Sequence, residues 1–370
     1  MKLSLDELRA LRLSNLGLLF QESASFPDIA SIVSSLGAVQ AQDYPGTLWA
    51  LGLRQRGLSE RDVQSAIESG SIVRTWPMRG TLHFVAAADL RWMVKLLTPR
   101  VITATRTRQA QLELDPAQFS KSQAIMRREL AGGRFLTREA LLAAVNAGGI
   151  STEGGRSYHL LFRAAMDQVI CNGPNQEKQL TFALLEDWVP VHLDRGLEGE
   201  AAIAELTWRY YSSHGPALAK DFAGWSGLSM KEVKTGLAAN KDRLESVKVE
   251  DEQYWWAPQN GTVPASARSL INQVHLLPGF DEYVLGYKNR SAILAAAFAN
   301  RICSGSNGIF SPTVVIGGQI RGTWKKTVRK GKVTVAAQPF TTFSAKERAA
   351  LSDAVQQYGE FYGLAGELVR

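Results

Sequence analysis

The sequence has few of the residues that build metal centres or disulfide frameworks. Its two cysteines, Cys171 and Cys303, lie far apart, which favours a reducing compartment over a fold held by disulfides. None of the five histidines lies three or four residues from another, so the spacing typical of a local zinc site is missing. We therefore expect no metal and no metal-dependent chemistry.

Motifs for membranes and nucleotides are also missing. No apolar run reaches the roughly 18 residues of a membrane span, and Asp6 and Glu7 interrupt the N-terminus where a secretory signal would be apolar. The paired glycines in "LAGGRF" and "STEGGRS" match neither a phosphate-binding loop nor a dinucleotide fingerprint. We expect no nucleotide, no other cofactor, no membrane association and a cytoplasmic location.

Positive charge is what the sequence does have. The 370 residues carry a net charge of +7, with a sequence pI near 9.4, and 45% of them are hydrophobic. This composition is typical of a globular protein of two to four domains. The excess of Lys and Arg favours a polyanionic partner, of which nucleic acid is the commonest, although a basic protein without such a partner fits equally well.

The pattern predicts an α+β fold, mostly helical, in four segments. Three tandem segments, 1–100, 101–197 and 198–269, each read as helices followed by a β-hairpin, which is the winged-helix arrangement. Thr137 and Ser229 stand where N-caps of two of these helices are expected. The fourth segment, 270–370, is β-rich, with hairpin signals at Gly317–Gly318 and Lys330–Gly331 and a closing helix capped by Ser344.

Basic residues cluster around the second of these hairpin signals. They are Arg321, Lys325, Lys326, Arg329, Lys330 and Lys332, with Trp324 interleaved. Across a strand pair they would form a cationic face suited to DNA phosphates. The alternative is a solvated outer face of a sheet, whose lysines protect an edge from aggregation.

Two further groups are candidates for a site. Arg74, Arg79 and His83 lie on the hairpin of the first segment, where His83 either lines a cleft or is half-buried and bonded to backbone. Asp281 and Tyr283 lie in "GFDEYVLGYKNR". We expect Asp281 and Glu282 to point to opposite sides of a strand, so that at most one of them faces a site. Asp281 beside Tyr283 fits a turn and packing device equally well.

The stretch "LGAVQAQDYPG" places two amides, Gln40 and Gln42, one residue apart. In an extended segment they point the same way and can converge on one atom. Two amides can hold and orient a water but cannot take its proton strongly, so the pair suits a reaction whose leaving group is already activated. The alternative is local backbone capping at the end of a helix that Pro45 terminates.

Five stretches together carry a family resemblance. They are "LGAVQAQDYPG", "LWALGLR", "RTWPMRGTLHFV", "LLPGFDEYVLGYKNR" and "VVIGGQIRGTWKK", in this order. The chain resembles the AlkZ-like winged-helix DNA glycosylases, whose relatives include the YcaQ (AlkX) group. The resemblance implies a C-shaped molecule of tandem winged helices and a β-rich domain that cleaves the N-glycosidic bond of N7-alkylated purines, including interstrand crosslinks. Gln40 and Gln42 match the family's Gln-x-Gln catalytic motif, and Asp43 falls just outside it.

We therefore expect a monofunctional DNA glycosylase that is monomeric, nucleoid-associated and acts on double-stranded DNA. The rival interpretations are a winged-helix transcription regulator and a non-catalytic binder of damaged DNA. The expected DNA contacts are Arg74, Arg79, His83, Arg321, Trp324, Lys325, Lys326 and Arg329. The candidate cleft residues are Asp43, Asp281 and Tyr283.

Overall fold

The computed structural model describes residues 3–19, 26–177, 179–249, 251–258, 273–303, 305 and 308–369. The chain forms two compact units, each assembled from separate stretches of sequence. Unit 1 comprises Met1–Asp28, Val39–Gln64 and Ala204–Arg370, and unit 2 comprises Ile29–Ala38 and Ser65–Ile203. The fold mixes helices and strands, as the sequence predicts. The expected boundary between 269 and 270 lies outside the described residues.

Unit 2 combines a β-hairpin with a helical core. Its elements are α2 (Ile29–Leu36), the C-terminal part of α4 (Glu60–Glu68), β2 (Ile72–Met78), β3 (Thr81–Ala86), α5 (Ala87–Gln111), α6 (Pro116–Leu130), β4 (Leu136–Thr137), α7 (Arg138–Ala147), α8 (Arg156–Met166), β5 (Ile170–Asn172), β6 (Thr181–Leu184) and α9 (Leu185–Trp188), and a short 3-10 turn (Val191–Leu193). Helix α5 runs through residues 100 and 101, so the boundary expected there does not coincide with a break in secondary structure.

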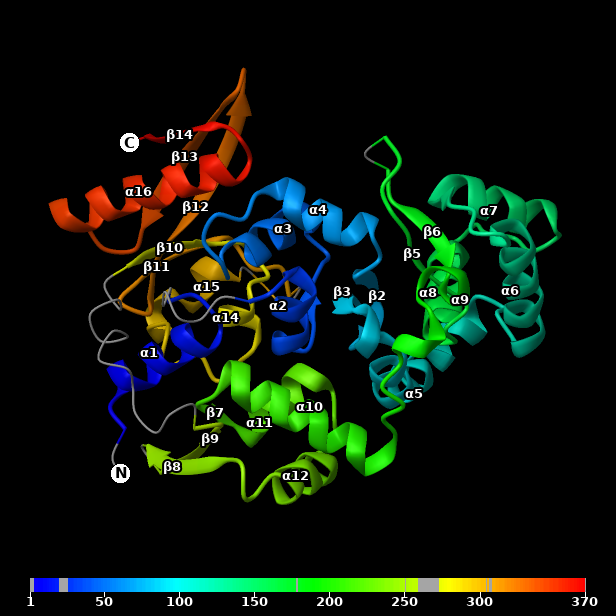
Figure 1. Cartoon of the computed structure of the whole chain (residues 1–370), viewed down its shortest axis with the longest axis horizontal. Coiled ribbons are helices and arrows are strands. Elements are labelled where there is room, and N and C mark those ends of the chain that lie inside the picture. The colour runs from blue at the N-terminus through cyan, green and yellow to red at the C-terminus, as the bar shows by residue number, and fades with distance from the viewer. Residues whose placement is uncertain are drawn as a thin grey trace. The chain divides into compact units, whose positions relative to one another are not determined.

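A three-stranded sheet in the order β4-β6-β5 lies beside α6, α7 and α8 in unit 2 (Figure 1). Thr137 accepts a hydrogen bond from the Ala140 N–H and caps α7, as its position in the sequence predicts. The buried core of this region includes Phe119, Leu141 and Phe162. One apolar face of each helix thus packs against the small sheet.

Unit 1 contains a second three-stranded sheet and a five-stranded one. Its elements are α1 (Leu5–Asn15), β1 (Val39–Gln40), α3 (Tyr44–Gly52), α10 (Gly199–His214, which begins in unit 2), β7 (Ala217–Leu218), α11 (Ala219–Ser226), α12 (Met230–Ala239), β8 (Glu245–Val249), β9 (Glu252–Trp256), β10 (Val274–Leu277), α14 (Glu282–Leu285), α15 (Ala299–Ile302), β11 (Thr313–Ile316), β12 (Gln319–Arg329), β13 (Lys332–Pro339), α16 (Ala345–Phe361) and β14 (Ala365–Val369), and a 3-10 turn (Ala296–Phe298). The smaller sheet has the order β7-β9-β8.

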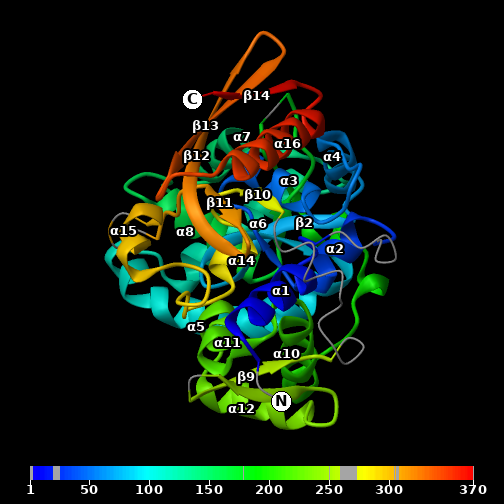
Figure 2. The ribbon, with the colours of Figure 1, turned by 90° about the vertical axis from the view of Figure 1, so that its left-hand side faces the viewer.

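The five-stranded sheet has the order β10-β11-β12-β13-β14, antiparallel except for β14, which pairs parallel to β13. Strand β11 pairs with the first part of β12, up to Thr323, whereas Lys325 to Arg329 pair with β13 alone among the described strands. Figure 2 shows the hairpin of β12 and β13 extending past β10 and β11, with α16 beside it. The hairpins at Gly317–Gly318 and Lys330–Gly331 and the Ser344 cap of α16 are confirmed. No helix in the described part of the chain is both long and apolar enough to cross a membrane.

Candidate active site

Gln40 ends β1 and Gln42 follows two residues later, and their side chains meet. Gln40 is 7% exposed, whereas Gln42 is exposed. Val39, which precedes Gln40, and Ala41, which lies between the two glutamines, are buried. The Gln40 Nε2 donates a hydrogen bond of 2.9 Å to the Gln42 Oε1. The extended backbone therefore brings the two amides together, one held inside the protein and the other at its surface.

The residues after the glutamines begin a helix and do not end one. Asp43 is the N-cap of α3 and accepts from the Gly46 N–H at 3.2 Å, and Pro45 stands in the first turn, where its missing N–H costs nothing. A Cβ at Gly46 would lie 2.2 Å from the Asp43 Oδ2, so glycine is needed for this cap. The alternative interpretation of Pro45 as a helix terminator is thus wrong, and Asp43 is occupied as a cap.

Asp281 and Tyr283 are buried and do not line a cleft, which corrects the expectation from the sequence. Asp281 caps α14 and forms a two-point ion pair with Arg54, at 2.5 and 2.9 Å. The Tyr283 hydroxyl donates to the Gly318 carbonyl at 2.6 Å. Both side chains are fully buried, and they join α3, α14 and the β11–β12 turn within unit 1.

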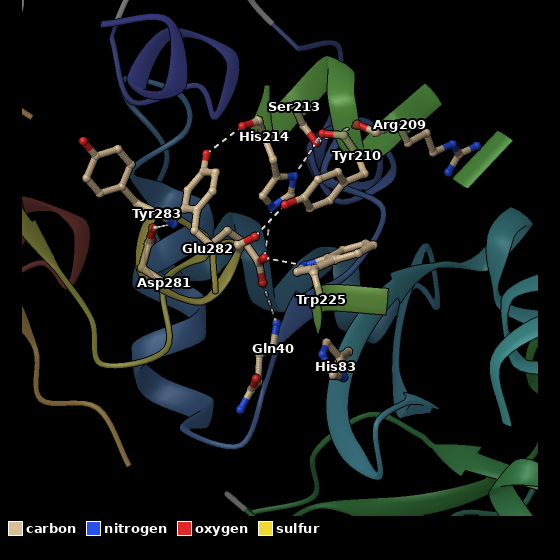
Figure 3. A network of polar contacts seen from close by, with 12 residues as sticks. Gln40, His83, Arg209, Tyr210, Ser213, His214, Trp225, Asp281, Glu282 and Tyr283 are labelled. Carbon is tan, nitrogen blue, oxygen red and sulfur yellow. Dashed lines mark hydrogen bonds and ion pairs between the residues drawn. The ribbon is translucent and has the colours of Figure 1, made fainter. Parts of the chain in front are cut away.

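Glu282, which the sequence offered only as the neighbour of Asp281, faces the backbone of Gln40. It stands at the start of α14 and not on a strand, and it is fully buried. Its Oε2 accepts from the Trp225 Nε1 at 2.8 Å and lies 3.1 Å from the His214 Nε2, and its Oε1 lies 3.5 Å from the Gln40 backbone N. Figure 3 shows Glu282 between Gln40 on one side and His214 and Trp225 on the other. Sequence spacing gave no signal for contacts across such long stretches of chain.

The basic residues of the β12–β13 hairpin are mostly at the surface. Lys325, Lys326 and Arg329 are exposed, and Arg321 is half-buried beside Glu347, 3.4 Å away. Trp324 is 4% exposed and donates to the Leu277 carbonyl at 2.9 Å, so it packs inside the sheet and not on the surface where a DNA contact was expected. The hairpin thus presents cations, with its tryptophan serving as a packing residue.

Lys326 differs from its neighbours because its ammonium lies against aromatic rings. The Nζ is 5.3 Å from the ring centres of Tyr358 and Tyr362 and donates to the Tyr358 hydroxyl at 2.6 Å. This desolvation lowers the pKa of Lys326, while Asp43 and Glu60 oppose the shift. Asp43, Lys325 and Lys326 line a small pocket of about 60 Å³, which has room for water but not for a purine.

The three candidates on the β2–β3 hairpin of unit 2 are only partly accessible. Arg74 is 6% exposed and His83 is fully buried, with its Nδ1 2.9 Å from the Thr81 carbonyl oxygen. Arg79 is half-buried, and its Nη2 lies 3.3 Å from the His83 Nε2. Arg74 and His83 are thus buried, contrary to what a DNA contact would need, and Arg79 is the more accessible of the three.

Most of the sequence matches one family model. Residues 33–361 match the family described as "DNA glycosylase AlkZ-like", so the chain belongs to the AlkZ-like family of DNA glycosylases. Gln40, Gln42 and Glu282 all fall within the matched residues.

Comparisons with two individual proteins agree with this family assignment. The chain is 27% identical over 321 residues to an interstrand DNA cross-link repair glycosylase of Streptomyces sahachiroi, covering 83% of this chain and 84% of the relative. Its structure is similar to that of the Streptomyces sahachiroi DNA glycosylase AlkZ, with a TM-score of 0.78, 23% sequence identity and full coverage of both chains. The likeness in structure shows that the two share a fold.

Proposed function

We propose that this protein is a monofunctional DNA glycosylase that hydrolyses the N-glycosidic bond of N7-alkylated purines in duplex DNA, with a water positioned by Gln40 and Gln42. The observation that carries the proposal is the 2.9 Å hydrogen bond between the two amides, one buried and one exposed. Family membership supports DNA as the substrate. The name of the relative from Streptomyces sahachiroi supports extending the substrates to interstrand crosslinks.

The hydrogen-bond pattern of the amides suits one water. Because the Gln40 Nε2 donates to the Gln42 Oε1, the Gln40 Oε1 can accept from a water and the Gln42 Nε2 can donate to it. A water that donates one hydrogen and accepts another retains a lone pair for attack. In this arrangement the lone pair would point at C1′ of the damaged nucleotide.

The chemistry of the leaving group explains why two weak amides suffice. Alkylation at N7 makes the purine cationic, so the glycosidic bond breaks with little proton transfer from the enzyme. The transition state resembles an oxocarbenium ion, and what the protein supplies is orientation of the water and electrostatic stabilisation. Asp43 takes no chemical step in this proposal because its carboxylate caps α3.

In this proposal the basic β12–β13 hairpin binds the DNA phosphates. Lys325 and Arg329 on β12 are exposed and would contact phosphates, with Lys326 and Arg321 near them. The strand orders β4-β6-β5 and β7-β9-β8, each with two helices between its first two strands in the chain, support the winged-helix interpretation of the second and third segments. We propose that the protein acts as a monomer on DNA in the nucleoid.

The test is base release from a defined lesion. A duplex with one 7-methylguanine is incubated with the protein, then split so that one half is treated with alkali and the other with borohydride. We expect alkali-dependent strand breaks, no covalent protein–DNA complex, and no reaction of an unmodified duplex. Absence of breaks from a folded sample that still binds the duplex would overturn the proposed activity on this lesion, and a trapped complex would overturn the monofunctional assignment.

A further inference from the structure

The side chain of Glu282 is held by hydrogen-bond donors on both of its oxygens. Its Oε2 accepts from the Trp225 indole and faces the His214 ring, and its Oε1 faces the Gln40 N–H. Glu282 and His214 are fully buried, and Trp225 is 1% exposed. A buried carboxylate is costly unless it is hydrogen-bonded or paired, so these contacts hold it in one place.

The ring of His214 is itself held by Ser213 on the side away from Glu282. The Ser213 Oγ donates to the Arg209 carbonyl oxygen at 2.7 Å and lies 2.8 Å from the His214 Nδ1. The His214 Nδ1 thus faces Ser213 while its Nε2 faces Glu282, so both ring nitrogens are engaged and the ring is held in one orientation against the carboxylate.

The backbone of Gln40 is held from two directions. The Thr47 hydroxyl in α3 lies 2.9 Å from the Gln40 carbonyl oxygen and 2.8 Å from that of Asp43, so the two carbonyls share this donor. The Gln40 N–H faces Glu282 at 3.5 Å, at the long end of the hydrogen-bond range. The Arg54–Asp281 ion pair joins the chain two residues after α3 to the start of α14. The α3 region and the start of α14, which both contact the backbone of Gln40, are therefore also joined to each other.

We propose that Glu282, fixed by His214 and Trp225, is a positioning residue that sets the backbone of Gln40 and so the direction in which the amide pair points. This inference rests on the proposed function of the glutamines. A small rotation at Gln40 would swing its amide away from Gln42, and a misplacement of about 1 Å at a reacting group can lower a rate by about 100-fold. Glu282 itself takes no chemical step.

The test replaces the carboxylate by an amide of the same size. Glu282→Gln places an NH₂ group either against the Gln40 N–H or against the Trp225 and His214 side chains, so that at least one donor loses its acceptor. We expect the single-turnover rate of base release from 7-methylguanine at saturating protein to fall about 10–100-fold, with the Kd for DNA within about threefold of wild type. A hydrogen–deuterium exchange measurement should show faster exchange in residues 39–43.

Asp221→Asn is the matched control. Asp221 is also fully buried in unit 1, and it accepts from the backbone N–H groups of Leu218, Lys288 and Asn289, at the start of α11 and after α14. We expect this variant to lose thermal stability while keeping the rate and the exchange of residues 39–43. An equal loss of rate in both variants would overturn the positioning role, because general destabilisation would explain it.

Other results of these measurements would also overturn the positioning role of Glu282. A folded Glu282→Gln protein with a rate within threefold of wild type and unchanged exchange in residues 39–43 would overturn the proposal. If that variant does not fold, Trp225→Phe removes one donor to the carboxylate, and a rate within twofold of wild type would overturn it. Inactivity of the wild-type protein would count against the glycosylase proposal alone, since the exchange measurement tests positioning without base release.

Discussion

The Gln40–Gln42 segment and the β12–β13 hairpin differ in how their side chains are held. Gln40 is buried, its backbone faces side chains from α3 and α14, and its amide is bonded to Gln42. Lys325 and Arg329 extend from a hairpin whose outer part pairs with β13 alone among the described strands. Orienting a water requires fixed geometry, whereas binding a phosphate requires mainly charge. The two regions should therefore respond differently to substitution.

The largest expected effect comes from exchanging each glutamine for glutamate. In Gln40→Glu a carboxylate is placed at a buried position and the Gln42 amide must turn to meet it, so we expect the single-turnover rate to fall about 100-fold. In Gln42→Glu the exposed carboxylate still accepts from the Gln40 Nε2 but no longer donates to the water, so the loss should be smaller, about tenfold. Equal losses in the two variants would show that the observed donor and acceptor roles are irrelevant to the rate.

A smaller effect, on DNA binding, is expected from substitutions in the β12–β13 hairpin. The double variant Lys325→Gln/Arg329→Gln removes two exposed cations, and we expect DNA binding at physiological salt to weaken about tenfold. The negative slope of log K against log salt should become shallower by about 2, about 1 for each lost phosphate contact. The rate at saturating protein should stay near wild type. An unchanged slope, measured by titration at several salt concentrations, would remove these residues from the DNA interface.

The smallest expected effect concerns Asp43, which adjoins the glutamines but caps α3. Asp43→Asn keeps the cap because asparagine serves as well as aspartate at this position, so rate and stability should both stay near wild type. Asp43→Ala should lose about 1 kcal/mol of unfolding free energy. Thermal or denaturant unfolding measures the second effect. A severe loss of rate in a stable Asp43→Asn protein would instead make Asp43 a catalytic carboxylate.

Local signals in the sequence predicted much of the fold. The caps at Thr137, Ser229 and Ser344 and the turns at Gly317–Gly318 and Lys330–Gly331 act through neighbouring residues, and each is confirmed. Helix α3 was missed because proline also stands in the first turn of helices, and Asp43 was the available signal for its start. Helix α5 was missed because Pro99 lies inside it.

The candidate site was predicted only in its local part. The convergence of Gln40 and Gln42 follows from the period of an extended chain and agrees with their 2.9 Å contact, while their catalytic role stays a prediction. The contact of Glu282 with Gln40 joins residues 242 positions apart, and no periodicity encodes such a pair. The burial of Asp281, Tyr283 and Trp324 likewise depends on tertiary packing.

The most direct measurement compares wild type with Gln42→Ala in single-turnover base release from a duplex containing 7-methylguanine, with the protein saturating and binding measured in parallel. Gln42 is exposed, so its truncation should leave the fold intact. We predict that Gln42→Ala binds the duplex with a Kd near that of wild type and releases the base about 100-fold or more slowly. A Gln42→Ala protein that releases the base at the wild-type rate would contradict the claim that the glutamine pair positions the water.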